Sequence, residues 1–316
     1  MRITLLAGGV GGARFLRGVL AAVPDAQITV IGNTGDDIEL FGLHVSPDLD
    51  TVMYTLGGGI SEEQGWGRDA ESYAVQSELS AYGAGPDWFS LGDRDFATHI
   101  VRTELLKAGH PLSAVTARLC ERWQPGVTLL PMTDDDVQTQ VLIDAGEGTA
   151  SIHFQEWWVR LHAKTTAHGF IAVGADRAAP APGVLAAIAD ADFVLLPPSN
   201  PVVSIGIILQ IPGVATAVAA KTVVGVSPVI GGAPVRGMAD ACLSAIGVPT
   251  SATGVAAHYG AELLDGWLVD VADRDAVSDA ELAGITVKAV PLYMTDIAAT
   301  TAMARAAIEL ATELRR

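Results

Sequence analysis

The stretch LLAGGVGGARFL, residues 5–16, has the pattern of a buried strand that turns sharply into a helix. An apolar run is interrupted by four glycines and is followed at once by helix-forming residues. Glycine lets the backbone adopt a positive φ and lets a ligand approach closely, and the N–H groups that open a helix can receive an anion. The stretch therefore predicts a strand–turn–helix unit, with a phosphate as the first candidate ligand of its turn.

The spacing of these glycines matches neither of the two common nucleotide-binding motifs. A dinucleotide fingerprint needs G-x-G-x-x-G, and Gly9 and Gly11 fit it, but the last glycine position holds Arg14. A P-loop needs a Gly-Lys pair, and the sequence contains none. Loose glycine matches also occur in strand-to-helix turns with a purely structural role, so this alternative stays open beside phosphate binding.

Outward from this stretch, apolar runs and helical patterns alternate at both ends of the chain. Short apolar runs predict strands at 2–7, 27–32, 127–132, 139–144, 150–155, 170–174, 192–197, 222–227, 267–271 and 285–290. Helical periodicity predicts helices at 11–23, 70–82, 96–108, 112–122, 182–189, 203–210, 236–246 and 295–314. The alternation predicts an α/β fold: a Rossmann-like, mostly parallel sheet in a three-layer arrangement.

The middle of the chain departs from this alternation. Residues 60–125 are mostly helix and loop, and closely spaced strands follow to about residue 160. We expect one domain over residues 1–316, with 60–165 as an inserted, mainly helical cap that carries a small β-meander.

Composition and charge exclude several classes of protein. The chain has 316 residues, half of them apolar, and a net charge of −17, which repels nucleic acid and anionic lipid. No apolar run is long enough to span a bilayer and the N-terminus has no signal-peptide pattern, so we expect a cytoplasmic protein without nucleic-acid or membrane partners. Cys120 and Cys242 lack metal-ligand spacing and predict buried thiols. An acidic protein that binds a phosphate has to neutralise it locally.

Four aspartates follow the second predicted strand. Asp36 and Asp37 lie in NTGDD, and Asp48 and Asp50 lie in FGLHVSPDLDT, all expected in loops past the strand end. One or two carboxylates, completed by substrate phosphate and water, are the usual protein ligands of Mg²⁺. Any single aspartate here has an alternative role as a turn or helix cap.

Three later segments add groups that could bind an anion or a ring. In LGDRDFATHIVR, Asp93 is expected to cap the helix, and Arg94 could donate to a phosphate or a ring carbonyl, with a surface salt bridge as its alternative. SNPVVSIG presents Ser199 and Asn200 beside a helix start, and VIGGAPVRGMAD presents Arg236. For each of the last two segments taken alone, ordinary helix capping explains these residues as well as anion binding does.

Seven segments, in this order, resemble one family of transferases. They are GGVGGARFL, NTGDD, SPDLDTVMYTL, LGDRDFATHIVR, HFQEWWVR, PPSNPVVSIGIILQIPG and VSPVIGGAPVRGMAD. The chain is similar, from residue 3 to about 295, to the transferase family of deazaflavin coenzyme biosynthesis: 2-phospho-L-lactate transferase in archaea and phosphoenolpyruvate transferase in actinobacteria. The wording of GVGGARFL and RWQPG resembles the actinobacterial branch.

The resemblance implies a reaction. A guanosine diphosphate ester of enolpyruvate or lactate (enolpyruvyl- or lactyl-diphosphoguanosine) would donate its phosphorylated three-carbon acid to the terminal ribityl hydroxyl of Fo, 7,8-didemethyl-8-hydroxy-5-deazariboflavin. GMP would leave and (dehydro)coenzyme F420-0 would form. Mg²⁺ and arginines would neutralise the transferred charge. The resemblance also implies a homodimer.

The resemblance assigns roles by motif. Asp50 and Arg94 would contact Fo, and Asp36 would coordinate Mg²⁺. Beyond the resemblance, we infer that Asp50 is near enough to help or to accept the hydroxyl proton. A further list, taken from loop position, would hold the guanosine diphosphate: Gly9, Gly11, Gly12, Ser199, Asn200 and Arg236. Trp157 and Trp158 could stack on a ring, pack in the core or lie at an interface.

Two other functions are alternatives to this one. A non-enzymatic regulator resembling the gluconeogenesis factors, which bind nucleotide sugars on a similar scaffold, would not need PDLDT and GDRD together, and both are present. An NAD(P)-dependent dehydrogenase is disfavoured by Arg14 at the third glycine position. The sequence leaves open whether the donor carries enolpyruvate or lactate.

Overall fold

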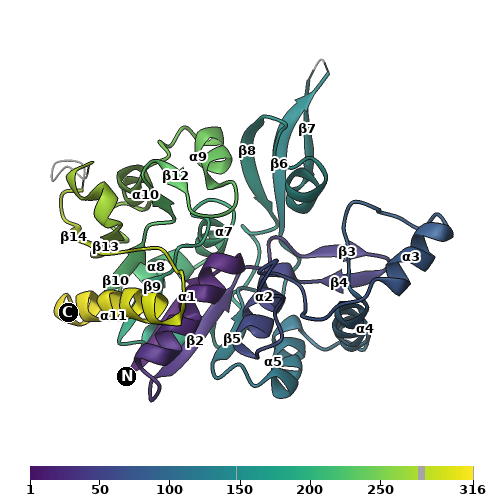
Figure 1. Ribbon diagram of the computed structural model, residues 1–316, viewed down its shortest axis with the longest axis horizontal. Helices are drawn as coiled ribbons and strands as arrows, with labels where there is room; N and C mark the ends of the chain where they lie inside the picture. Colours follow the sequence, from purple (N-terminus) through teal and green to yellow (C-terminus); the bar gives the residue numbers. More distant parts are fainter. Residues whose placement is uncertain (147, 277–281, 316) are drawn as a thin grey trace.

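The protein is built on a seven-stranded parallel sheet, shown by a computed structural model that describes residues 1–146, 148–276 and 282–315 (Figure 1). The strand order is β14-β13-β10-β9-β1-β2-β5, and every neighbouring pair is parallel. The strands are β1 Arg2–Ala7, β2 Gln27–Gly32, β5 Thr128–Pro131, β9 Phe193–Leu196, β10 Val223–Val226, β13 Gly266–Val269 and β14 Thr286–Ala289. The predicted α/β class with a mostly parallel sheet is confirmed.

Helices cover both faces of this sheet, and each face has its own apolar core. Within β1, Ile3 and Leu5 face one core while Leu6 faces the other, because successive strand side chains point to opposite faces. The first core lies under α1 Gly9–Ala22, α2 Pro47–Leu56, α5 Leu112–Trp123 and α11 Ile297–Glu313. The second lies under α6 Val184–Asp190, α7 Ile205–Gln210, α8 Val214–Ala219, α9 Ala239–Ala245 and α10 Ala252–Tyr259. These layers confirm the three-layer prediction.

The order of the strands creates a topological switch point between β1 and β9. From β1 the chain first builds outward through β2 to β5, and it returns through β9 on the other side of β1. The loops that leave β1 and β9 therefore diverge from adjacent strand ends, which is where open α/β sheets form their ligand crevice. The glycine turn follows β1, and the segment that contains Ser199 and Asn200 follows β9.

The middle of the chain forms smaller units that project from one side of the sheet (Figure 1). They include α3 Ala74–Ala81, α4 Asp93–Lys107 and a three-stranded antiparallel sheet of β6 Gln138–Ala145, β7 Gly148–His153 and β8 Ala167–Val173. The residues of β5 fall inside the range 60–165 that the sequence suggests as an inserted cap, yet they form the edge strand of the main sheet. The division of the chain into a domain and a cap stays a prediction.

The segment after β2 contains more regular structure than the sequence indicates. Asp48 and Asp50 were expected in a loop, but the chain here forms the hairpin β3 Ile38–Leu40 and β4 Leu43–Val45 and then α2, which contains both. Phe41 and Gly42 both have positive φ, the geometry of a tight two-residue hairpin turn. Pro47 stands at the first position of α2, where its missing N–H costs nothing, and it is the sequence signal for the start of this helix.

Four short elements complete the structure, and one of them shows the role of Trp157. They are a second hairpin of β11 Val229–Ile230 and β12 Ala233–Pro234, a 3-10 helix at Val271–Ala276 and a π-helix at Glu156–Arg160. Trp157, in the π-helix, is fully buried in the second core and donates its indole N–H to Thr165 O at 2.8 Å. Trp157 is thus a core residue. No helix within the described ranges has the length and apolar character to cross a membrane.

Candidate functional site

The glycine turn after β1 packs directly against the loop after β9. A Cβ added to Gly11 would lie 2.3 Å from Pro198 O, and one added to Gly12 would lie 2.7 Å from Ser199 Oγ. The Ser199 hydroxyl also donates to Gly8 O at 2.7 Å and accepts from Gly8 N at 3.2 Å. The structure therefore brings together the two loops that the sequence suggested. Gly11 and Gly12 have a structural reason to be glycine; their predicted contact with phosphate stays a prediction.

Two buried carboxylates lie beside this turn and share one amide. Asn33, directly after β2, donates from Nδ2 to Asp36 Oδ1 at 2.8 Å and to Asp48 Oδ2 at 3.0 Å. A Cβ added to Gly8 would lie 2.7 Å from Asp48 Oδ2, so Asp48 also faces the glycine turn. Asp36, Asp48 and the turn form one polar cluster at the switch point.

The pKa values of both carboxyls are raised. Burial is the main cause for Asp36, and the nearby charge of Asp48 adds to it. Burial also raises the pKa of Asp48 to about 6, although the Asn33 amide opposes this shift. A positive charge between two buried carboxylates would stabilise their ionised forms, because it would offset their mutual repulsion and their loss of hydration.

Asp50 lies in a different environment from Asp48, although only one residue separates them. Since each helical residue turns the side chain by roughly 100°, positions two apart in α2 point to nearly opposite sides. Asp50 therefore faces α4, where it forms a buried ion pair with Arg102, and its Oδ2 lies 3.7 Å from His99 Nδ1. The loop expected from the sequence would have let all four aspartates converge; the helix separates them into two groups.

Asp37 links these two groups. Its Oδ2 accepts from the Ser46 hydroxyl at 2.7 Å and lies 2.8 Å from His44 Nε2. Burial raises the pKa of Asp37, while His44 and, more weakly, the charge of Arg102 oppose the shift. A continuous set of buried polar groups thus runs from the glycine turn to α4. Asn33, Asp37, Asp48 and Arg102 belong to it. The sequence pointed to Asp37 and Asp48 as members of an aspartate cluster without giving them a role, and it did not point to Asn33 or Arg102.

Arg94 and Asp93 stand at the exposed start of α4. Arg94 Nη1 donates to Asp69 O at 3.1 Å, and its side chain is exposed. Asp93 accepts from Val75 N at 2.9 Å and therefore caps α3, not its own helix as expected. The start of α4 is capped by Glu71, whose carboxylate accepts from the backbone N–H groups of Arg94 and Asp95.

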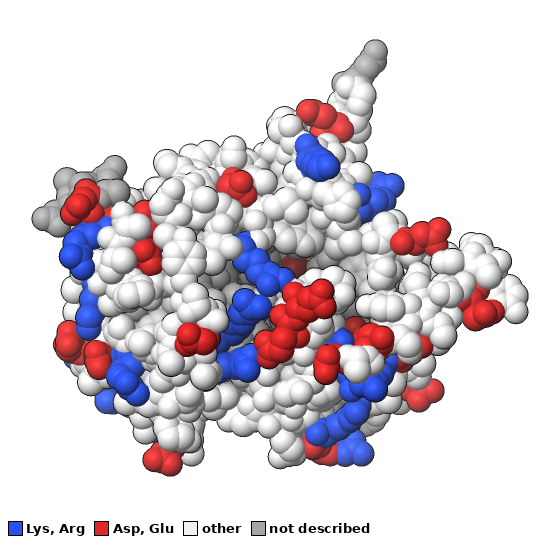
Figure 2. All heavy atoms as spheres, in the orientation of Figure 1, with Lys and Arg blue, Asp and Glu red and all other residues white. Residues whose placement is uncertain are grey.

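The two remaining assigned residues are engaged within the protein. Asn200 Oδ1 accepts from Val202 N at 2.9 Å and from Val203 N at 3.2 Å, so it shapes its own loop. Arg236 is exposed and donates to Gln64 O, which joins the end of the β11–β12 hairpin to the loop before α3. Figure 2 shows basic side chains gathered beside a hollow near the middle of one face, with acidic ones at its edge. The roles of Asn200 and Arg236 in nucleotide binding stay predictions.

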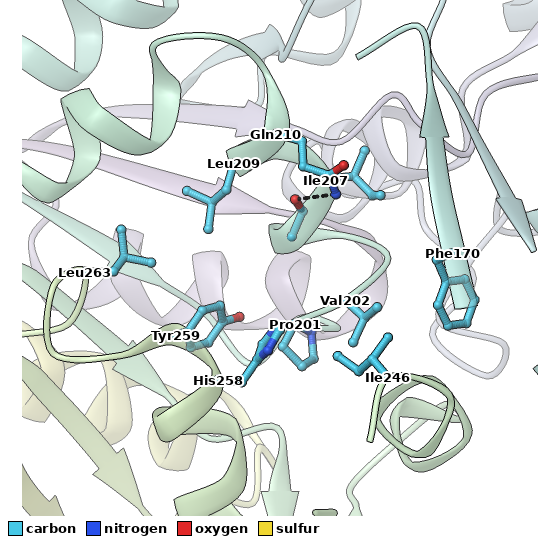
Figure 3. A pocket seen from close by; sticks show the side chains of 11 residues that line it. Phe170, Pro201, Val202, Ile207, Leu209, Gln210, Ile246, His258, Tyr259 and Leu263 are labelled. Carbon is cyan, nitrogen blue, oxygen red and sulfur yellow. Dashed lines mark hydrogen bonds between the residues drawn. The ribbon is translucent and has the colours of Figure 1, made fainter. Parts of the chain in front are cut away.

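Two measurable pockets lie away from the carboxylate cluster. A pocket of about 330 Å³ lies behind the loop after β9, lined largely by apolar groups such as Pro201, Val202, Ile207 and Tyr259 (Figure 3). A second, of about 540 Å³, lies between Gly247–Gly254 and Asp273. Over the ranges that the structure describes, no group of three or more His, Cys, Asp or Glu side chains could by itself hold a metal ion.

The stability of the fold should depend on the charge of Asp95, which lies in the first turn of α4. Burial and the charge of Asp50 raise the pKa of Asp95 to about 7. Between about pH 4 and 7 the unfolded chain loses this proton while the folded protein keeps it, so the free energy of unfolding falls as pH rises. We expect Asp95→Asn to be more stable than wild type by about 1–3 kcal/mol at pH 8 and equal to it at pH 4.

Urea unfolding at the two pH values measures this difference. Asp25→Asn, an exposed change in the turn between α1 and β2, is the control and should track wild type at both. An equal difference between Asp95→Asn and wild type at pH 4 and pH 8 would contradict the assignment.

Together these features define a class: a Rossmann-like α/β protein with a glycine turn and buried carboxylates at its topological switch point. The family model described as "2-phospho-L-lactate transferase CofD" matches residues 3–309. The chain belongs to the CofD family, and it is a transferase of coenzyme F420 biosynthesis.

Curated relatives span the whole chain. A phosphoenolpyruvate transferase of Thermobifida fusca is 66% identical over 323 residues, covering 100% of this chain and 99% of the relative. One of Streptomyces griseus is 64% identical with full coverage of both, and one of Nocardia farcinica is 55% identical with 98% and 95% coverage. The similarity to the actinobacterial branch is confirmed.

Solved structures show the same fold in a distant protein. A crystal structure of a Bacillus halodurans member of the UPF0052 family superposes with a TM-score of 0.62. It covers 97% of this chain and 99% of that one at 16% identity. At this identity the likeness concerns the fold alone.

Proposed function

We propose that this protein transfers a phosphoenolpyruvyl group from a guanosine diphosphate ester to the terminal ribityl hydroxyl of Fo. The hydroxyl oxygen would bond to the phosphorus beside the three-carbon acid, the bond from that phosphorus to GMP would break, and the hydroxyl proton would be taken up by a base. GMP and dehydro-coenzyme F420-0 would be the products. The observation that carries the proposal is the 54–66% identity to relatives named phosphoenolpyruvate transferase. The name of the family model keeps 2-phospholactyl as the alternative group.

The carboxylate cluster fits a divalent cation. Asp36 and Asp48 are buried, share a single amide donor and have raised pKa values, so a cation between them would relieve an unfavourable arrangement. Two carboxylates with substrate phosphate and water are an ordinary Mg²⁺ site. We therefore propose that Asp36 and Asp48 hold Mg²⁺, in place of the expected pair Asp36 and Asp50. Bound there, Mg²⁺ would neutralise the charge that develops on the diphosphate.

The other residues of the site would bind and orient the two substrates. The Asp48 carboxylate lies against Gly8 and Gly9 at the start of α1. The N–H groups that open this helix would receive the diphosphate beside it. Arg94 and Asp50 would contact Fo, and Asp50 would take the proton of the attacking hydroxyl. Such a transfer depends on positioning and charge neutralisation more than on covalent catalysis.

Product analysis tests this proposal directly. The protein is incubated with Fo, Mg²⁺ and either enolpyruvyl- or lactyl-diphosphoguanosine, and the new phosphodiester is sought by mass spectrometry. We expect the enolpyruvyl ester to give product and EDTA to suppress it. No product with either donor would contradict the transferase proposal and leave the nucleotide-sugar-binding regulator as the remaining hypothesis.

We also propose a cytoplasmic homodimer. Light scattering during gel filtration would test the oligomeric state.

A further inference from the structure

One face of α4 carries polar groups toward α2 that the proposed reaction does not yet use. Asp95, His99 and Arg102 stand four and three residues apart, the spacing that puts side chains on one helix face. All three are buried, and Arg102 is only 1% exposed. Opposite them lies Asp50 of α2. Asp50 therefore lies in a buried polar interface between α2 and α4.

The Arg102 guanidinium is fixed by contacts on both terminal nitrogens. Nη2 donates to Asp50 Oδ1, while Nη1 donates to His99 Nδ1 at 3.0 Å and reaches His44 O at 3.4 Å. Because burial lowers the pKa of His99, its ring stays neutral and Nδ1 can act as the acceptor. His99 and the His44 carbonyl thus set the orientation in which Arg102 meets Asp50.

This arrangement occupies one oxygen of Asp50 and leaves the other without a partner. Oδ1 accepts from Arg102, whereas the buried Oδ2 has no hydrogen-bond partner anywhere in the described structure. A buried carboxylate oxygen without a donor costs stability, and a buried ion pair is often no more stable than an apolar pair of the same size. Stability alone therefore gives a poor reason for this pair.

We propose that Arg102 is a positioning residue for the acceptor hydroxyl, an inference that rests on the proposed function. By binding Oδ1, Arg102 fixes the carboxylate plane of Asp50 and aims Oδ2 at the hydroxyl of the acceptor. His99 supports this role by orienting the guanidinium. The free Oδ2 then receives its missing hydrogen bond from the substrate and takes its proton as the new phosphorus–oxygen bond forms.

Steady-state kinetics of Arg102 variants tests the inference. We expect Arg102→Met to lower kcat about 10²- to 10³-fold, because a misdirected base loses most of its contribution. The KM for the donor should stay within about twofold, since the diphosphate contacts lie at the other end of the polar cluster. Arg102→Lys keeps the charge without the second anchoring contact and should give an intermediate kcat. Leu106→Ala, which removes apolar packing one turn further along α4, is the control and should stay within about threefold of wild type.

A double variant separates positioning from folding. In an Asp50→Asn background there is no carboxylate to orient, so adding Arg102→Met should lower kcat by less than about threefold. This variant also removes both buried charges together, so it keeps the comparison possible if Arg102→Met alone folds poorly. Urea unfolding of every variant shows which of them are folded at the assay temperature.

The outcomes distinguish this inference from the proposed function. An Arg102→Met enzyme as active as Leu106→Ala, or an equal loss in the wild-type and Asp50→Asn backgrounds, would overturn the positioning role and leave the transferase proposal standing. A wild type that forms no product from Fo and either donor would overturn the proposed function itself.

Discussion

Replacing Asp50 by Asn is expected to lower kcat by at least about 10²-fold while the fold survives. An amide cannot take the proton of the attacking hydroxyl, and loss of a positioned base costs on the order of 10²- to 10⁴-fold. The side chain keeps its size, so α2 and α4 can still pack around it. Turnover with Fo and the enolpyruvyl donor measures the effect, and circular dichroism checks the fold.

The matched control for Asp50→Asn is Asp144→Asn, the same chemical change at an exposed site. It should leave turnover unchanged. An Asp50→Asn protein with near-wild-type kcat would remove this carboxylate from the reaction and would also end the argument for Arg102.

Replacing Asp36 by Asn should have opposite effects on activity and on stability. Without this carboxylate the proposed cation site loses half of its protein ligands, and we expect kcat to fall by about 10³-fold or more. At pH 8 the same change should raise the free energy of unfolding by about 1–3 kcal/mol, because it removes a buried charge that Asp48 repels. Functional sites commonly hold such locally unfavourable arrangements.

The pH dependence of that gain provides its control. The pKa of Asp36 is raised, so both folded and unfolded wild type are protonated at low pH, and Asp36→Asn should have no advantage near pH 3. Unfolding by urea at pH 3 and pH 8, without added metal, makes the comparison. A variant that is less stable than wild type at pH 8 would show that Asp36 is a structural residue and not a strained ligand.

Much of the fold could be predicted because short apolar runs, typical of strands buried on both faces, alternate with helical patterns along the chain. The glycine turn after β1 and the loop after β9 were placed together from their positions after strands, and Ser199 does contact Gly8. That success came from topology, since adjacent parallel strands end at the same edge. The sequence alone therefore predicted that these two loops meet.

The distribution of aspartates within the site could not be predicted in the same way. Asp48 and Asp50 were expected in a loop, and only the helix α2 shows that they lie on opposite sides of one element. The sequence does show that Asp95, His99 and Arg102 have the spacing of one helix face, which indicates a polar face on α4. What the sequence could not show is that this face packs against α2, because long-range pairing of buried charges leaves no local pattern.

The central claim is that the diphosphate of the donor lies between the glycine turn of α1 and a cation held by Asp36 and Asp48. A crystal structure of the protein with GDP and Mn²⁺ tests it most directly, because the anomalous signal locates the metal independently of the model. We predict one peak between these two carboxylates, with the phosphates against the N–H groups at the start of α1. A diphosphate bound elsewhere, such as in the pocket at Gly247–Gly254, would contradict the account.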